Sequence, residues 1–274
     1  MAVNAKGPDG QGGGLPDKSW VGRSFGRAAD SYDGLADLQR RTADTLLAEV
    51  FQTATVPGRI LDVGAGTGYP AGRLCEQWPQ TQLLALDLAE GMLQVAQRRL
   101  SHHANVRFIC ADAESLPLAH ASVDVVFSSL ALQWCVDLPA ALAECWRVLK
   151  PGGLFLFSTF GPETLVELKR AWATVDTHTH VLGFQETAVI RRAVEVLKWE
   201  TCELRSLHNN LAYPDVYALM HELKGLGAHN VTRDRPRHLQ GKSAWKRMLA
   251  AYPAACSGDG ITAAFEIITV HCRK

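Results

Sequence analysis

The sequence predicts an α/β fold built around a mainly parallel sheet. Short apolar segments alternate along the chain with segments whose apolar residues recur every three or four positions. The apolar segments are nearly continuous rather than alternating, which is typical of strands buried on both faces. A glycine-rich turn also follows the first apolar segment. The 274 residues suffice for one large domain with a sizeable core.

The expected strands are short apolar runs that end at turn residues. Pro57 and Gly58 precede the first run, and Pro151 and Gly152 stop the helix before the fifth. The expected strands cover 59–63, 82–87, 106–110, 123–129, 154–159, 200–206 and 262–271.

The expected helices are recognised from apolar residues on one helical face. Leu35, Leu38, Leu46, Leu47 and Val50 form the first such stripe. Further helices are expected at 90–100, 140–149, 163–173, 186–197, 214–224 and 243–251. The stretch 207–250 lacks a strand pattern, so we expect a helical lid or insertion there. Residues 1–22, rich in glycine, are expected to be a disordered tail before a domain spanning 23–274.

Composition excludes several classes of protein. The 28 basic and 28 acidic side chains give a formal net charge of zero, which argues against a general nucleic-acid binder. No apolar run is long enough for a membrane helix, and the N-terminus does not resemble a signal peptide. Seven cysteines without metal-site spacing are expected to be reduced thiols of a cytoplasmic protein, with no metal bound.

The most informative motif is the glycine turn after the first strand. Glycines at 64, 66 and 68 let the backbone turn tightly and approach a ligand closely. Tyr69 stands where a dinucleotide fingerprint has its third glycine, so the spacing favours a ligand without a diphosphate. Asp87 ends the next strand, 21 residues after Gly66, where a carboxylate can bind both hydroxyls of a ribose.

Two further elements belong to the same edge of the predicted sheet. Asp112 and Ala113 follow the third strand, and an aspartate there can accept a hydrogen bond from an adenine amino group. Ser129 and Leu130 end the fourth strand and would line the floor of the crevice.

This ordered set of motifs resembles the class I S-adenosylmethionine-dependent methyltransferases. The resemblance implies a seven-stranded sheet with an antiparallel last strand and helices on both faces. It also implies S-adenosylmethionine as the cofactor. The implied cofactor-binding residues are Tyr32, Gln39, Asp62, Gly64, Ala65, Gly66, Asp87, Leu88, Met92, Asp112, Ala113, Ser129 and Leu130. Tyr32 would close over the methionine end or pack on the sheet edge, and Gln39 would bind the methionine carboxylate or face solvent.

Blocks outside the core resemble one family more narrowly, the malonyl-acyl-carrier-protein O-methyltransferases of biotin synthesis. These blocks are residues 25–33, 38–39, 129–135, 157–160, 224–229 and 260–266. Two positions depart from the family pattern, since Leu182 stands where an asparagine is common and Ala264 near a common aromatic position.

The resemblance implies that the acceptor is a carboxylate, which is already ionised at neutral pH. No general base is then needed, and the rate depends on alignment and on removal of water. We expect Tyr32 and Gln133 to position the reactants. Expected acceptor-binding residues are Gln133, Trp134, His180, His229 and Asn230, each of which could instead be structural.

A basic run at 231–250 is either a solvated face or a docking face for the acidic carrier protein. Its basic residues are Arg233, Arg235, Arg237, Lys242, Lys246 and Arg247. We expect a monomer that binds neither nucleic acid nor membrane. Two alternatives stay open: methylation of another small acceptor, such as trans-aconitate or a quinone ring, and cofactor binding without catalysis.

Overall fold

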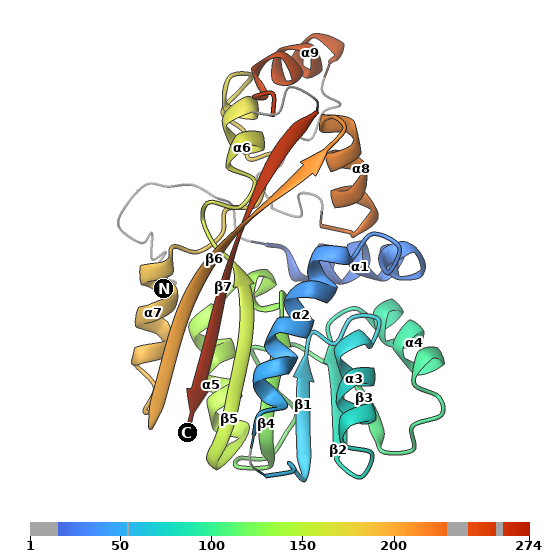
Figure 1. The fold of residues 1–274 in the computed structure, drawn as a ribbon, viewed down its shortest axis with the longest axis vertical. Helices are drawn as coiled ribbons and strands as arrows, with labels where there is room; N and C mark the ends of the chain where they lie inside the picture. Colours follow the sequence, from blue (N-terminus) through green and yellow to red (C-terminus); the bar gives the residue numbers. More distant parts are fainter. Residues whose placement is uncertain (1–15, 54, 229–240, 256–259) are drawn as a thin grey trace, which may run out of the picture.

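The computed structural model describes residues 16–53, 55–228, 241–255 and 260–274. Their centre is a seven-stranded sheet with the order β3-β2-β1-β4-β5-β7-β6 (Figure 1). The strands are β1 (Arg59–Val63), β2 (Gln82–Asp87), β3 (Val106–Cys110), β4 (Val123–Ser129), β5 (Leu149–Phe160), β6 (Thr201–Tyr213) and β7 (Ile261–Arg273). Strands β1 to β5 pair in parallel, and β7 is antiparallel to both β5 and β6. The predicted fold class is therefore confirmed.

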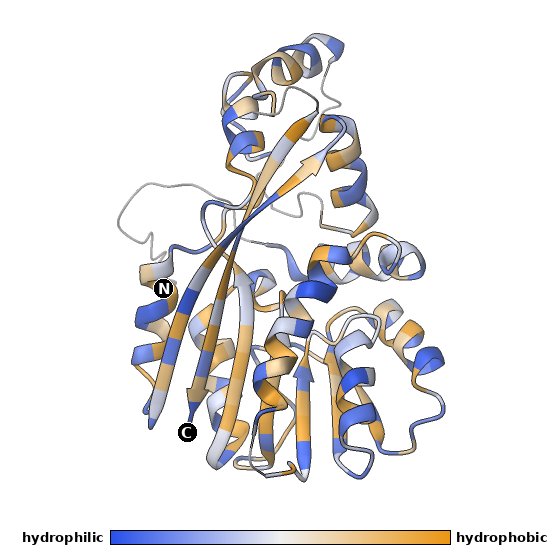
Figure 2. Ribbon diagram, viewed as in Figure 1, coloured by the Kyte–Doolittle hydropathy of each residue, from blue (hydrophilic) through white to orange (hydrophobic). Residues whose placement is uncertain are grey.

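The helices cover both faces of this sheet. They are α1 (Lys18–Tyr32), α2 (Asp37–Val50), α3 (Tyr69–Gln77), α4 (Glu90–Arg99), α5 (Leu138–Val148), α6 (Val166–Ala173), α7 (Thr187–Glu195), α8 (Val216–Gly225) and α9 (Lys242–Ala251). Apolar residues of α2 and α3 pack on one face, and those of α5 and α7 pack on the other. Hydrophobic residues accordingly dominate the central strands (Figure 2). Among the described residues, no helix is both long and apolar enough to cross a membrane.

A third apolar cluster lies beyond the carboxyl end of the parallel strands. Helices α6, α8 and α9 gather there around the extended ends of β6 and β7 (Figure 1). Strand β6 pairs with β7 from Thr201 to Tyr213, so residues 207–213 are strand rather than insertion, contrary to the expectation. Their polar sequence did not predict a strand, because β6 lies at the edge of the sheet and most of its residues are exposed.

The start of the chain also differs from the expectation. Residues 18–22 belong to α1 and not to a disordered tail. Asp17 caps this helix, because its side chain accepts hydrogen bonds from the backbone N–H groups of Ser19 and Trp20. Val21 is buried, which anchors the first turn of the helix.

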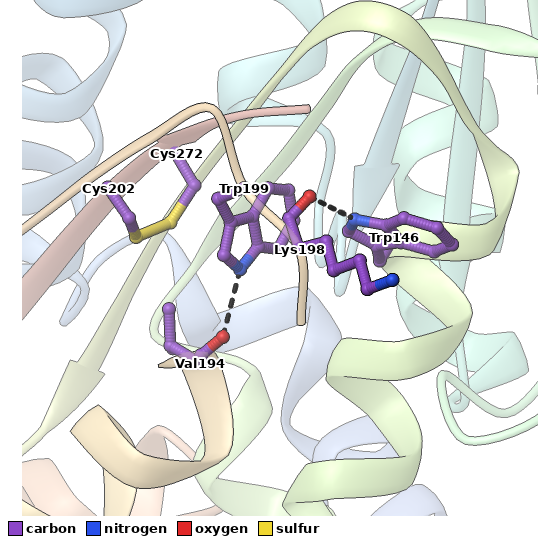
Figure 3. Close-up of a disulfide and its surroundings, with 6 residues drawn as sticks. All are labelled: Trp146, Val194, Lys198, Trp199, Cys202 and Cys272. Atoms are coloured by element: carbon purple, nitrogen blue, oxygen red, sulfur yellow. Dashed lines mark hydrogen bonds between the residues drawn. A yellow bond between two sulfur atoms is a disulfide. The ribbon is translucent and has the colours of Figure 1, made fainter. Parts of the chain in front are cut away.

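Two of the cysteines form a disulfide, contrary to the expectation that all seven are reduced thiols. Cys202 of β6 and Cys272 of β7 are register partners and are joined by a disulfide (Figure 3). Trp199 lies beside this pair and donates a 3.0 Å hydrogen bond to the carbonyl of Val194 in α7. The pairing was not visible in the sequence, because 70 positions separate the two residues. Cys75, Cys110, Cys135 and Cys145 are free thiols.

Candidate active site

The glycine turn connects β1 to α3 and is held against β2. The backbone N–H groups of Gly64 and Ala65 donate to the carbonyl of Leu86 over 2.7 and 2.9 Å. Gly64 has a φ of +75°, and a Cβ there would lie 2.1 Å from the Cβ of Ala131. A Cβ on Gly66, in contrast, would meet no atom within 4 Å. The turn therefore packs tightly at Gly64 and leaves open space for a ligand at Gly66.

Asp87 links this turn to the end of β2. Its carboxylate accepts hydrogen bonds from the backbone N–H of Gly66 at 2.9 Å and that of Ala89 at 2.8 Å. Burial raises the pKa of Asp87, although those N–H groups oppose the shift. The side chain thus shapes the turn while lining the cavity beside it.

Asp62 lies beneath the turn and is almost inaccessible. Neither of its carboxylate oxygens has a hydrogen-bond partner among the described residues. Burial, together with the charge of Asp87, raises the pKa of Asp62 to about 8. Burial without a partner therefore favours the neutral, protonated form of this acid near neutral pH.

A cavity of about 110 Å³ lies above the turn and is called here the cofactor cavity. Most of the expected cofactor-binding residues line it: Tyr32, Gly64, Gly66, Asp87, Leu88, Met92, Asp112, Ala113, Ser129 and Leu130. Asp62 and Ala65 lie outside its wall, in the support of the turn. The glycine cradle, the carboxylates at strand ends and the apolar Met92 fit a bound S-adenosylmethionine, whose methyl sits on a sulfonium.

Helix α1 covers this cavity with residues that the sequence analysis missed. Lys18, Val21 and Phe25 line it together with Tyr32. Their offsets of three, seven and fourteen positions place all four on one helical face, a signal that could have identified them. Burial, then the charges of Asp87 and Asp33, raise the pKa of Tyr32, so its phenol remains protonated.

A second cavity of about 400 Å³ adjoins the first and is called here the acceptor cavity. Trp134 lines both cavities, and its ring packs edge-on against Phe25 with centroids 5.1 Å apart. The walls are mostly apolar and come from α2, α6, α8, α9 and the ends of β5 and β7. Leu182, the departure from the family pattern, is part of this wall.

His180 and Gln39 also line the acceptor cavity. The imidazole of His180 stacks on Trp172 at a centroid distance of 3.9 Å and bonds to Asp176 over 2.8 Å. Gln39, which was expected at the cofactor, lines the acceptor cavity and not the cofactor cavity.

Gln133 lines neither cavity, although it was expected to bind the acceptor. Its amide donates to the carbonyl of Leu130 over 2.6 Å and accepts from the hydroxyl of Thr159 over 3.3 Å. These bonds stabilise the turn that follows β4.

Several expected acceptor-side residues lie outside the described residues: His229, Asn230, Arg233, Arg235 and Arg237. Lys242, Lys246 and Arg247 are exposed on α9, whose Trp245 lines the acceptor cavity. Within the described part of the chain, no group of three or more metal-binding side chains is present.

This chain is similar to known proteins both in its fold and in its sequence. A family model described as a methyltransferase domain matches residues 61–157. The YcgJ protein of Bacillus subtilis shares the fold, with a TM-score of 0.61 at 20% identity over 84% of this chain and 98% of that one.

Curated relatives are much closer in sequence. The malonyl-acyl-carrier-protein O-methyltransferase of Methylococcus capsulatus is 44% identical over 94% of both chains. The biotin biosynthesis bifunctional protein BioHC of Cellvibrio japonicus is 39% identical over 92% of this chain and 49% of its own length. This chain therefore belongs to the family of malonyl-acyl-carrier-protein O-methyltransferases, which are S-adenosylmethionine-dependent enzymes.

Proposed function

We propose that this enzyme transfers the methyl group of S-adenosylmethionine to the free carboxylate of a malonyl thioester on acyl carrier protein. The reaction would be an early step of biotin synthesis, in agreement with the names of the relatives. The observation that carries the proposal is the adjoining pair of cavities. One holds the glycine turn and Asp87, the other is apolar, and Trp134 belongs to both.

The chain's own residues would act by binding and alignment. S-adenosylmethionine, when bound, supplies a methyl group activated by a positively charged sulfur. A malonyl carboxylate is ionised at neutral pH, so its oxygen can attack without a protein base. Phe25 and Trp134 pack together in the wall of the cofactor cavity, so their rings would help to exclude water where the two cavities meet. Exclusion of water raises the free energy of the two opposite charges, which the transfer neutralises, and alignment removes much of the entropic barrier.

Helix α9 would provide part of the docking face for the carrier protein. Lys242, Lys246 and Arg247 are exposed on this helix, while Trp245 points into the acceptor cavity. The sequence continues the basic run with Arg233, Arg235 and Arg237. Carrier proteins are acidic, so a positive face beside the cavity would steer and orient them.

We further propose that the enzyme works as a cytoplasmic monomer. Residues of a single chain build both cavities, so the site needs no second copy. Malonyl carrier protein, the proposed acceptor, is consumed where fatty-acid chains are built.

Methyl transfer to malonylated carrier protein tests the function directly. Labelled S-adenosylmethionine should place a base-labile methyl ester on the malonyl group, while acetylated carrier protein, which has no free carboxylate, should remain unlabelled. Labelling of free trans-aconitate or of a quinone, with none on the malonyl group, would contradict the proposal. Tight cofactor binding without turnover on any of these acceptors would indicate a non-catalytic protein.

A further inference from the structure

Helix α8 carries an exposed aromatic ring beside the acceptor cavity. Tyr217, in the first turn of this helix, is 59% exposed. Its ring stacks on that of Trp245 in α9, with the centroids 6.3 Å apart and an angle of 10° between the planes. Trp245 in turn lines the acceptor cavity. The stacked pair therefore leads from the surface of the molecule to the wall of this cavity.

The face of α8 that carries Tyr217 continues to the opening of the cavity. Three further residues of this face follow at offsets of three, four and seven positions: Met220, His221 and Lys224. All three line the acceptor cavity, and His221 and Lys224 are also exposed. An exposed residue that lines a cavity marks the place where the cavity meets solvent. Tyr217 thus lies one helical turn from this opening.

The helix on which the ring stacks also carries exposed positive charge. Lys242, Lys246 and Arg247 of α9 are exposed, and α8 and α9 lie at the same end of the molecule (Figure 1). Protein interfaces commonly combine an aromatic anchor with a charged rim. A partner that fits this surface is acidic and offers the ring an apolar contact. It also has a reason to approach the opening of the acceptor cavity.

We propose that Tyr217 is the apolar anchor on which malonylated carrier protein docks, while the basic residues of α9 steer it. This inference rests on the proposed function, because it assumes that the acceptor arrives on the acidic carrier protein. The stack on Trp245 holds the phenol ring in place before the partner arrives, so little side-chain freedom is lost on binding. Docking there puts the carrier protein next to the opening through which its arm reaches the cavity.

The test compares a malonyl substrate that includes the carrier protein with one that lacks it. Tyr217→Ser should raise KM for malonylated carrier protein about tenfold and leave kcat nearly unchanged. The malonyl thioester of N-acetylcysteamine has no carrier protein, so its kcat/KM should be the same with Tyr217→Ser and with the wild type. Because the contact is apolar, the rise in KM should persist at high salt, where the effect of reversing charges on α9 diminishes.

Two variants serve as controls. Tyr217→Phe keeps the ring and should retain the wild-type KM for malonylated carrier protein. Val196 follows α7 and is 81% exposed, and α7 lies well apart from α9 in Figure 1. Val196→Ser should therefore leave this KM unchanged. If the small thioester turns over too slowly, calorimetry with malonylated carrier protein should show about tenfold weaker binding to Tyr217→Ser, with wild-type affinity for S-adenosylhomocysteine.

Three results would overturn the assignment. Tyr217→Ser could keep the wild-type KM for malonylated carrier protein. It could slow both substrates equally, which would make Tyr217 a support of Trp245 and of the cavity wall. Analytical ultracentrifugation could reveal a wild-type dimer that Tyr217→Ser converts to a monomer, which would assign the ring to a second copy of this chain. A wild-type enzyme that methylates neither malonyl substrate would instead refute the proposed function, so the two failures are distinguishable.

Discussion

The ammonium group of Lys18 lies 2.5 Å from Oδ2 of Asp112, across 94 positions of the sequence. A second ion pair joins Lys18 to Glu114 at 2.6 Å. Burial lowers the pKa of Lys18, but the bonds to Asp112 and Glu114 outweigh it and leave this pKa raised. The charged ammonium therefore holds the start of α1 on the rim of the cofactor cavity.

Replacing Lys18 by Met should weaken the binding of S-adenosylhomocysteine about three- to tenfold, because α1 loses its tie to the rim. Calorimetry at low salt measures the change, and the wild-type affinity should fall more steeply with salt than that of the variant. Arg27→Met alters an exposed basic residue of the same helix and serves as the control. Equal affinities of wild type and Lys18→Met would show that α1 is held without this residue.

Two glycines of the turn should respond differently to the same substitution. Both have positive φ, so alanine at either site costs roughly 1–2 kcal/mol in backbone strain. Gly64→Ala also collides with Ala131 and should lower the free energy of unfolding by about 1–3 kcal/mol more. Gly66→Ala places its methyl in open space, so this variant should be more stable than Gly64→Ala. It should nevertheless bind the cofactor at least about tenfold more weakly than the wild type, because the methyl occupies the space for the ligand.

Urea denaturation and calorimetry measure these two effects separately. A Gly66→Ala protein with wild-type affinity for S-adenosylhomocysteine would mean that the open space is not the cofactor cradle. Equal stability of Gly64→Ala and Gly66→Ala would mean that Ala131 can move away from the added methyl group at little cost.

Asp62 should make stability depend on pH. The unfolded chain releases this proton near pH 3.8, whereas the folded protein keeps it until about pH 8. The stabilising contribution is thus fully present below pH 3.8 and is lost as pH rises towards about 8. The slope of unfolding free energy should reach at most about 1.4 kcal/mol per pH unit from this group.

Asp62→Asn should flatten that decline, which denaturant unfolding at several pH values can measure. Asp30→Asn provides the control, because its side chain is 89% exposed. Identical pH profiles for wild type and Asp62→Asn would refute a protonated Asp62 in the folded protein at neutral pH.

Charge reversal on α9 tests the docking face. Lys246→Glu combined with Arg247→Glu should raise KM for malonylated carrier protein about tenfold while kcat changes little, because encounter and docking weaken. The effect should diminish at high salt. Reversing the exposed Arg191 and Arg192 on α7, a helix that lies well apart from α9 in Figure 1, should leave KM unchanged. An unchanged KM in the α9 variant would place docking elsewhere.

Local patterns sufficed for much of the fold and for grouping the residues at the strand ends. The strands before Gly64 and Asp87 could be predicted because apolar runs and turn residues are properties of neighbouring positions. Parallel strands bring their carboxyl ends to one edge, so Asp87, Asp112 and Ser129 could be grouped without coordinates. The structure places these three side chains around one cavity.

Other assignments failed because they depend on neighbours far away in the chain. The polar edge strand at 207–213 forms because β7 pairs with it. Helix α1 starts early because Val21 is buried and Lys18 pairs with the distant Asp112. Gln133 and Gln39 are both amides, and their sequence positions do not reveal which of them has hydrogen-bond partners. The side chain of Gln133 bonds to Leu130 and Thr159, whereas Oε1 of Gln39 is buried without a hydrogen-bond partner among the described residues.

The sheet, the glycine turn, the strand-end carboxylates and the family could all be recognised from the order of the residues. Those features follow from short-range periodicity and from blocks of residues that keep their order. The folded arrangement was needed to show which residues line each cavity, that Lys18 reaches Asp112, and that Cys202 meets Cys272. The reason is physical: burial and partnership depend on packing between distant elements, and no local pattern encodes the free volume that packing leaves.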